Sequence, residues 1–261
     1  MAATESEPQT MSFWEHLDEL RSRLVRAVFA FAIGAGVAWW FKEKLLLILT
    51  QPFVDGWVAH SSTKASLHFP APASLFIAYV KLAMLGGFVL SLPIILYQAW
   101  AFVAPGLYAR EKRVAIPFVA ASCALFALGA YFGLRVAFPA AFDFLLSLAK
   151  LPENSPLLME PTVMIEEYMD FVLQALLAFG LVFEIPVVVF FLSFVGLINH
   201  THLIKFGRYF IVLAFVIAAI FTPPDPLSQI LLAGPLCILY GISIGIAWLV
   251  DKSRKKQASA S

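Results

Sequence analysis

The sequence predicts an all-α integral membrane protein whose six transmembrane helices form a single domain. Two observations support this fold class. Hydrophobic residues make up 61% of the 261 residues and charged residues only 13%, whereas soluble domains are about 45–50% apolar and about 25% charged. The apolar residues also gather into runs that approach the length of about 20 residues needed to cross a bilayer. This composition excludes an ordinary soluble enzyme, a disordered protein and a fibrous one.

Six candidate spans follow one another, separated by charged residues or turn signals. They are expected at about residues 24–41, 75–103, 114–138, 168–198, 209–221 and 227–250. The first ends in Trp39, Trp40 and Phe41, an aromatic group that suits a headgroup interface. The second is long and contains Pro93, so we expect a kink or a strong tilt there.

The later spans differ in how they begin and end. Pro117 lies near the start of the third span and Pro186 inside the fourth. The fifth holds only 13 residues between Arg208 and Thr222, or about 20 Å of helix against about 30 Å of hydrocarbon, so we expect a locally thinned bilayer. The sixth follows the turn at residues 222–226 so closely that the last two spans should form a tight hairpin.

Positive charges favour one side of this bundle. Twelve of them flank the spans on the side of the termini: Arg21, Arg23, Arg26, Arg110, Lys112, Arg113, Lys205, Arg208, Lys252, Arg254, Lys255 and Lys256. The opposite loops carry only Lys42, Lys44, Lys64 and Lys150. By the positive-inside rule both termini should be cytoplasmic.

The expected organisation has three parts. Residues 1–23 form a cytoplasmic segment with an interfacial helix, 24–250 the six-helix domain, and 251–261 a cytoplasmic tail. The two longer outer segments, 42–73 and 139–167, are expected to form short caps over the helix ends.

The segment before the first span carries a charged face opposite an apolar one. Phe13, Leu17, Leu20 and Leu24 recur at helical spacing, as in a helix that lies at the membrane surface. Glu19 falls on the wet face. It either forms an i,i+4 pair with Arg23 in a solubilising helix or accepts a cationic group of a partner.

Two further carboxylates are unusual for their surroundings. Glu111 lies among Arg and Lys residues between spans two and three, where it could damp repulsion, suit the dipole of a starting helix, or bind a ligand. Glu184 lies midway along the fourth span. A charge there costs at least a few kcal/mol, so Glu184 should be protonated, face other helices or meet a polar partner. A satisfied bundle residue, a proton relay, an ion site and a docking point for a partner helix all remain open.

The start of the last span holds a polar group. Asp225, beside Thr222 and among prolines, suits a turn or a helix cap, while Gln229 could hydrogen-bond a second helix. Cys123 and Cys237 give neither a disulfide framework nor metal-ligand spacing. No phosphate loop, zinc motif or nucleophile arrangement is found, so the sequence predicts no enzyme, metal or cofactor. A net charge of +1 does not suggest a nucleic-acid partner.

Together these motifs resemble the TatC family, the six-span core subunit of the twin-arginine protein translocase. The resemblance covers nearly all of residues 13–250. It rests on HLDELRSRL at 16–24, QPF at 51–53, SLPIILYQAWAFVAPGLY at 91–108, FGLVFEIPV at 179–187 and TPPDPLSQILLAGPLCILY at 222–240. It implies a concave, glove-like bundle in the bacterial cytoplasmic (inner) membrane, with both termini cytoplasmic and self-association of the chain.

The resemblance also implies roles for the residues singled out above. Recognition of twin-arginine signal peptides would fall to Glu19 and Glu111, with Arg21 and Phe102 in support. A carboxylate accepts a bidentate guanidinium bond that Lys cannot reproduce, which suits a demand for paired Arg. Single-span TatA/TatB-type helices would dock at Glu184, Thr222 and Gln229, with Pro52 and Asp225 near the outer rim. The implied activity is export of folded proteins driven by the proton motive force, without a cofactor.

Two positions depart from the family pattern. Gly241 stands where many relatives carry Glu, and Lys112 stands where Arg is common after the loop glutamate.

Two other function classes stay open. A secondary transporter or proton channel would use Glu184 as its carrier and the kinks at Pro93 and Pro186 as gates, but the sequence shows neither inverted repeats nor a second deep acidic residue. A passive membrane scaffold would share the docking face without binding Arg-containing peptides selectively.

Overall fold

The computed structural model describes residues 13–60, 63–103, 115–148, 161–221 and 226–258. Its elements are α1 (Phe13–Trp40), α2 (Lys42–His60), α3 (Pro72–Val103), α4 (Ala115–Phe132), the π-helical turn η3 (Gly133–Ala137), α5 (Phe138–Ser147), α6 (Ile165–Phe183), α7 (Ile185–Val195), α8 (His200–Phe221) and α9 (Pro226–Ala258). Within these ranges the only β pairing is one isolated bridge, between His68 and Met164. The predicted all-α class is confirmed.

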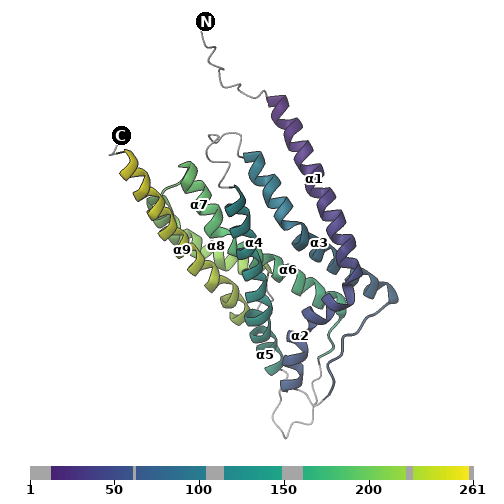
Figure 1. Ribbon diagram of the computed structural model, residues 1–261. Helices are drawn as coiled ribbons and strands as arrows, with labels where there is room; N and C mark the ends of the chain where they lie inside the picture. Colours follow the sequence, from purple (N-terminus) through teal and green to yellow (C-terminus); the bar gives the residue numbers. More distant parts are fainter. Residues whose placement is uncertain (1–12, 61–62, 104–114, 149–160, 222–225, 259–261) are drawn as a thin grey trace.

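Within the described ranges, six helical segments are long and apolar enough to cross a membrane. They are Trp14–Trp40, Pro72–Phe102, Ile116–Ser147, Ile165–Val195, His200–Ile220 and Pro226–Lys252. The number of spans therefore agrees with the prediction, and the start of α1 and the end of α9 lie at the same end of the molecule (Figure 1). The bundle is wide at that end and narrows toward α2 and α5.

Helices α1 and α3 form an antiparallel pair along one side of the bundle (Figure 1), called the arm below. Their backbones touch at glycines. A Cβ added at Gly34 would lie 2.7 Å from the Gly87 carbonyl oxygen, and one added at Gly87 would lie 2.5 Å from the Ala35 nitrogen. Small residues of this kind let membrane helices approach closely enough for backbone van der Waals contact.

The main core lies around α6. Met169 and Val172 are fully buried there, and aromatic rings from three helices meet beside them. The Phe53 ring of α2 lies 5.4 Å from that of Tyr168 and 6.0 Å from that of Phe142 of α5. The Tyr168 hydroxyl, placed among these rings, donates to the Leu49 carbonyl at 2.7 Å, so its polar atom is satisfied.

Two predicted boundaries were wrong. Helix α8 runs through Lys205 and Arg208, both of which are exposed, so the fifth span has 22 helical residues rather than 13. At about 1.5 Å per residue this helix is about 33 Å long, and the expected thinning of the bilayer loses its basis. The segment at 42–73 is also more than a short cap, because α2 has 19 residues and buries Phe53 and Trp57.

Two other segments refine the prediction. Helix α1 is continuous from Phe13 to Trp40, so the proposed interfacial helix and the first span are one helix; the division at residue 23 stays a prediction. The fourth span is interrupted at Glu184, between α6 and α7. Pro186 explains the break, because proline lacks the N–H and its ring crowds the carbonyl four residues before it.

Candidate functional site

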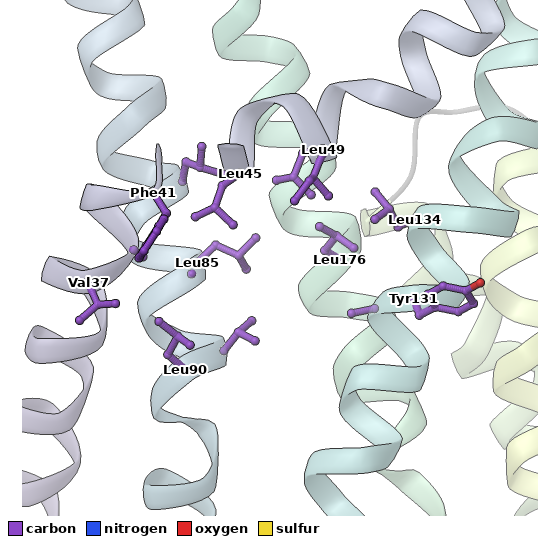
Figure 2. Close-up of a pocket in the computed structure, with 15 residues that line it drawn as sticks. Val37, Phe41, Leu45, Leu49, Leu85, Leu90, Tyr131, Leu134 and Leu176 are labelled. Carbon is purple, nitrogen blue, oxygen red and sulfur yellow. The ribbon is translucent and has the colours of Figure 1, made fainter. Parts of the chain in front are cut away.

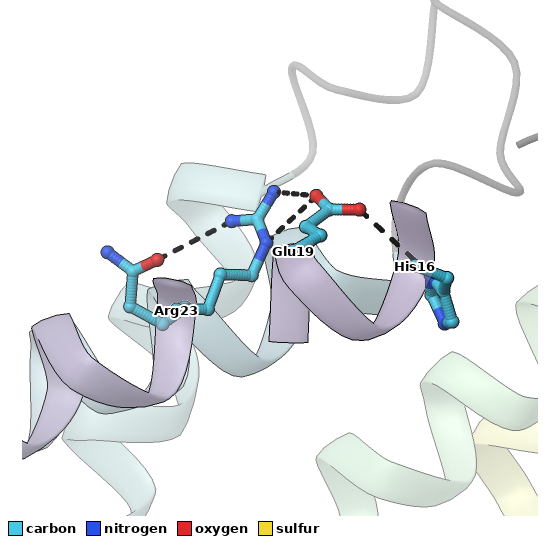
Figure 3. Close-up of polar contacts among 4 residues, drawn as sticks. His16, Glu19 and Arg23 are labelled. Atoms are coloured by element: carbon cyan, nitrogen blue, oxygen red, sulfur yellow. Dashed lines mark hydrogen bonds and ion pairs between the residues drawn. The ribbon is translucent and has the colours of Figure 1, made fainter. Parts of the chain in front are cut away.

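The first candidate site lies at the start of α1, where Glu19 faces Arg23 one turn further along. The Nε and Nη2 atoms of Arg23 both donate to Glu19 Oε1, at 2.9 and 2.5 Å. The Nη1 atom of the same guanidinium donates to Gln98 Oε1 of α3 at 3.4 Å, as Figure 3 shows. The predicted i,i+4 pair is therefore confirmed, and it also ties α1 to α3.

The second carboxylate oxygen of Glu19 accepts no hydrogen bond from the described residues. Its Oε2 atom is buried and has no hydrogen-bond partner among the described residues, although His16 Nδ1 lies 4.0 Å away. The His16 ring in turn stacks on Phe102 of α3, with ring centroids 4.4 Å apart and an interplanar angle of 19°. The fold therefore brings Glu19 and Phe102 into one cluster through His16, which sequence reasoning had not singled out.

The other residues assigned to signal recognition are placed differently. Arg21 is exposed on α1, two residues from Glu19. Glu111 lies outside the described residues. The geometry thus describes one of the two expected carboxylates, together with the aromatic residue beside it.

The second candidate site surrounds Glu184, at the break between α6 and α7. Its backbone N–H donates to the Leu181 carbonyl at 3.1 Å, and its own carbonyl accepts from Val187 and Val188. Ser122 of α4 lies close to the Glu184 carboxyl group, while Oε1 is buried without a hydrogen-bond partner among the described residues. Glu184 thus faces another helix, which is one of the alternatives that the sequence left open; its role stays a prediction.

The third candidate group is described only in part. Gln229 Nε2 of α9 donates to the Phe215 carbonyl of α8 at 3.1 Å, which confirms that this amide hydrogen-bonds a second helix and that the last two spans pack as a hairpin. Thr222 and Asp225 lie outside the described residues. Pro52 is buried inside α2.

The ion pairs that sequence reasoning missed include two that link helices far apart in the chain. Lys81 Nζ of α3 lies 2.6 Å from Asp170 Oδ1 of α6, joining the arm to the core. Asp251 Oδ2 of α9 accepts from both the backbone N–H and Nδ1 of His200, at 2.9 and 2.6 Å, and so caps α8 from 51 residues away. The pair between Lys81 and Asp170 could have been suspected, because the two residues carry opposite charges within apolar spans. No pattern in the sequence near His200 or Asp251 indicated that these two residues pair.

Metal binding has no support in the described part of the chain. No three His, Cys, Asp or Glu side chains among the described residues are placed to hold a metal ion.

Comparisons with known proteins agree with this architecture. A family model described as Sec-independent protein translocase protein (TatC) matches residues 15–235. The TatC protein of Koribacter versatilis is 37% identical over 252 residues, which cover 96% of this chain and 90% of that protein. The TatC protein of Aquifex aeolicus is 39% identical over 246 residues, covering 94% of this chain and 98% of that one.

A solved structure gives the same result for the fold. A crystal structure of a twin-arginine translocase receptor, TatC, superimposes with a TM-score of 0.78 at 39% identity, covering 91% of this chain and 100% of that one. With its six apolar helices, this protein is a multi-pass membrane protein, consistent with a place in the bacterial inner membrane. Because the family match, the relatives and the fold all agree, the chain belongs to the TatC family of Sec-independent protein translocase proteins.

Proposed function

We propose that this protein is the receptor subunit of a twin-arginine translocase: it binds twin-arginine signal peptides and, with TatA/TatB-type single-span proteins, exports folded proteins using the proton motive force. The observation that carries the proposal is the open, buried Oε2 atom of Glu19. A buried acceptor without a donor is unfavourable, and a guanidinium from a bound peptide would satisfy it with a charge-assisted hydrogen bond.

The surroundings of Glu19 suit an arginine rather than a lysine. Arg23, which itself donates to Gln98, holds the Glu19 carboxylate in place, so little side-chain freedom is lost when a ligand binds. The stacked rings of His16 and Phe102 offer an aromatic edge beside it. A guanidinium stacks on aromatic rings and donates in a planar fork, whereas a lysine ammonium is a strongly hydrated point charge.

Arg23 also limits how a ligand can bind. Because it already occupies Oε1, an incoming guanidinium either pairs with Oε2 alone or displaces Arg23 to take both oxygens. Glu111 would supply the acceptor for the second arginine of the signal. Both carboxylates would face the cytoplasm, as the positive-inside rule requires for the side that carries the termini.

Partner helices would dock at a second site, formed by Glu184, Thr222 and Gln229. The open Oε1 of Glu184 supports this role, because a carboxyl group at membrane depth gains from a polar group offered by another helix. Self-association of the chain is part of the same proposal, as is the place of Pro52 and Asp225 near the outer rim.

Peptide binding to the purified full-length protein in detergent tests the receptor role. The fluorescence anisotropy of a labelled twin-arginine signal peptide is compared with that of its Lys-Lys variant. Glu19→Gln keeps the shape of the side chain but loses its charge, and it should weaken binding of the Arg-Arg peptide by about 10- to 100-fold, the value of a hydrogen bond to a charged group.

Asp18→Asn is the matched control, because Asp18 is exposed on the same turn and its loss removes the same charge. It should bind like the wild type. Equal binding of both peptides to wild type and Glu19→Gln would contradict the assignment. Proton or solute flux through vesicles that contain this chain without partner subunits would instead support a transporter.

A further inference from the structure

Two cavities of different chemistry lie side by side near α2. The apolar cavity has a volume of about 450 Å³ and is bounded by α1, α2, α3, α4, η3 and α6; Val37, Leu85, Leu90 and Tyr131 are among the side chains around it in Figure 2. The polar cavity has a volume of about 660 Å³ and is lined by Leu47, Ile48, Gln51, Pro52, Asp55, Leu134, Arg135 and Pro139. Because Ile48 and Leu134 line both, the cavities share a wall.

The polar cavity holds one cation and one anion. Arg135 is exposed and forms no ion pair within the described parts of the chain. The Asp55 carboxylate accepts a hydrogen bond from Gln51 Nε2 at 2.7 Å and is not paired with Arg135. The cavity therefore offers a phosphate-binding group and an ammonium-binding group at once.

Both helices that form the shared wall are irregular there. Pro52 lies inside α2 and cannot donate the backbone bond that the Ile48 carbonyl would accept in a regular helix. Leu134 and Arg135 lie in the π-helical turn η3, a distortion that often occurs at functional sites. These two local distortions from separate parts of the chain meet at one cavity wall.

Aromatic residues indicate the depth of the two cavities. Trp39 and Tyr79 lie under the Lys42 ammonium, with ring centroids at 5.2 and 5.7 Å, as expected where a membrane meets water. Phe41, next to Lys42, lines the apolar cavity. The apolar cavity thus lies on the hydrocarbon side of this boundary, and the polar cavity, lined by the α2 residues that follow, lies toward the headgroups.

We propose that the two cavities together bind one phospholipid with a primary ammonium headgroup. Its phosphate contacts Arg135, its ammonium contacts Asp55, and one acyl chain fills the apolar cavity. The zwitterion matches both charges, whereas an anionic lipid would leave Asp55 unmatched and an apolar peptide segment would leave both unmatched. The volumes lie within the range of about 300–1,000 Å³ usual for ligand cavities. The proposal does not depend on how signal peptides bind.

Native mass spectrometry of the full-length protein provides the test. The protein is released from nanodiscs that contain phosphatidylethanolamine, phosphatidylcholine and phosphatidylglycerol in equal amounts, and the retained lipids are counted. Wild type should retain one phosphatidylethanolamine at least 10-fold more often than the other two, because phosphatidylcholine cannot donate hydrogen bonds and phosphatidylglycerol carries no cation.

Variants separate the parts of the site. Arg135→Gln should reduce retention of all three lipids at least 10-fold. Asp55→Asn should abolish only the preference for phosphatidylethanolamine over phosphatidylcholine, and Val89→Trp, which fills the apolar cavity, should abolish retention. Lys44→Gln is the control, since Lys44 is an exposed cation of α2 that lines neither cavity, and it should behave like the wild type.

Two results would overturn the proposal. The first is unchanged lipid retention in Arg135→Gln. The second is equal retention of the three lipids by wild type. If Arg135→Gln loses its helical circular dichroism signal, Arg135→Lys and Asp55→Asn provide the test instead. Arg135→Lys should weaken lipid retention, and Asp55→Asn should lose the preference for the phosphatidylethanolamine headgroup.

Discussion

The arm and the core of this protein are held together in different ways. Only 11% of the residues in the most apolar stretch of α1 are buried inside the protein, against 56% in the most apolar stretch of the span formed by α6 and α7. Trp40 and Phe29 of α1 are 84% and 67% exposed and face the bilayer, whereas Met169 and Val172 of α6 are fully enclosed. Helix α1 of the arm packs mainly against α3, whereas α6 packs against several helices of the core.

This contrast shows what stabilises a helix in lipid. Burying an apolar side chain against another helix gains little there, because lipid tails are equally apolar. The arm therefore relies on close backbone contact at Gly34 and Gly87 and on the polar link from Arg23 to Gln98 at its end. The core adds interlocking aromatic rings. We infer that the arm is the more adjustable part, and it is the part that carries Glu19.

The largest expected effect is in the core. A Cβ at Gly129 of α4 would lie 2.4 Å from the Phe179 carbonyl oxygen and 2.9 Å from the Phe183 side chain, so Gly129→Ala requires the α6 backbone to move. We expect a loss of about 3 kcal/mol in the free energy of unfolding, measured by denaturant unfolding in detergent. Gly241→Ala is the control, because nothing lies within 4 Å of a Cβ there and alanine favours helix. Equal stability of the two variants would contradict the close α4–α6 contact.

A smaller loss of stability is expected in the arm. Gly87→Ala places a Cβ 2.5–2.8 Å from Ala35 atoms and pushes α1 away from α3, which should cost about 2 kcal/mol. Because Gln98 then moves relative to Arg23, the affinity for a twin-arginine peptide should fall more than in Gly129→Ala, after correction for the folded fraction. Gly36→Ala, with open space around its Cβ, should leave the affinity unchanged and should not lower the stability, because alanine favours helix. A loss of stability without a loss of affinity would uncouple the arm from the binding site.

The connection between arm and core gives a third comparison. Lys81 and Asp170 are partly exposed, with 34% and 46% of their side chains accessible, so their pair should contribute about 1 kcal/mol or less. Lys81→Ala should destabilise the protein more than Lys81→Ala combined with Asp170→Ala, because the single change leaves the Asp170 carboxylate without its counter-charge. A double-mutant cycle with thermal unfolding measures the difference, and strictly additive losses would show that the pair does not couple the two regions.

The smallest expected effect is at the α8–α9 hairpin. Gln229→Leu removes the bond to the Phe215 carbonyl while keeping the size of the side chain, and hydrogen bonds between membrane helices average about 0.6 kcal/mol. Unfolding should therefore shift only slightly. Ile230→Val, one residue along and exposed, is the control. A loss of several kcal/mol in Gln229→Leu would show that the hairpin depends on this one bond.

Boundaries were predicted well where apolar length alone decides them and poorly where charged residues lie on a helix. The predicted fifth span began only after Arg208, but α8 begins at His200, because Lys and Arg side chains on a helix can extend their charged ends to the membrane surface. The sequence also did not predict α2 as a helix, because it contains Pro52 and mixes polar with apolar residues. One side of α2 is buried only because α5 packs against it.

The candidate site shows the same division. The i,i+4 spacing of Glu19 and Arg23 was sufficient to predict their pairing, because a helix brings such residues together on its own. The contribution of Gln98, 75 residues further along, and the stacking of His16 on Phe102 depend on how α3 returns beside α1. No local pattern encodes that arrangement.

The sequence by itself determined that this protein lies in a membrane, how many times it crosses the membrane and to which family it belongs. The length of apolar runs, the placement of charges and the order of motifs can all be seen directly along the sequence. Only the tertiary structure decided which oxygen of Glu19 is left open, that Asp251 caps α8, and that Arg135 and Asp55 share a cavity beside an apolar one. These features join residues distant in sequence, and their geometry is set by the packing of helices against each other.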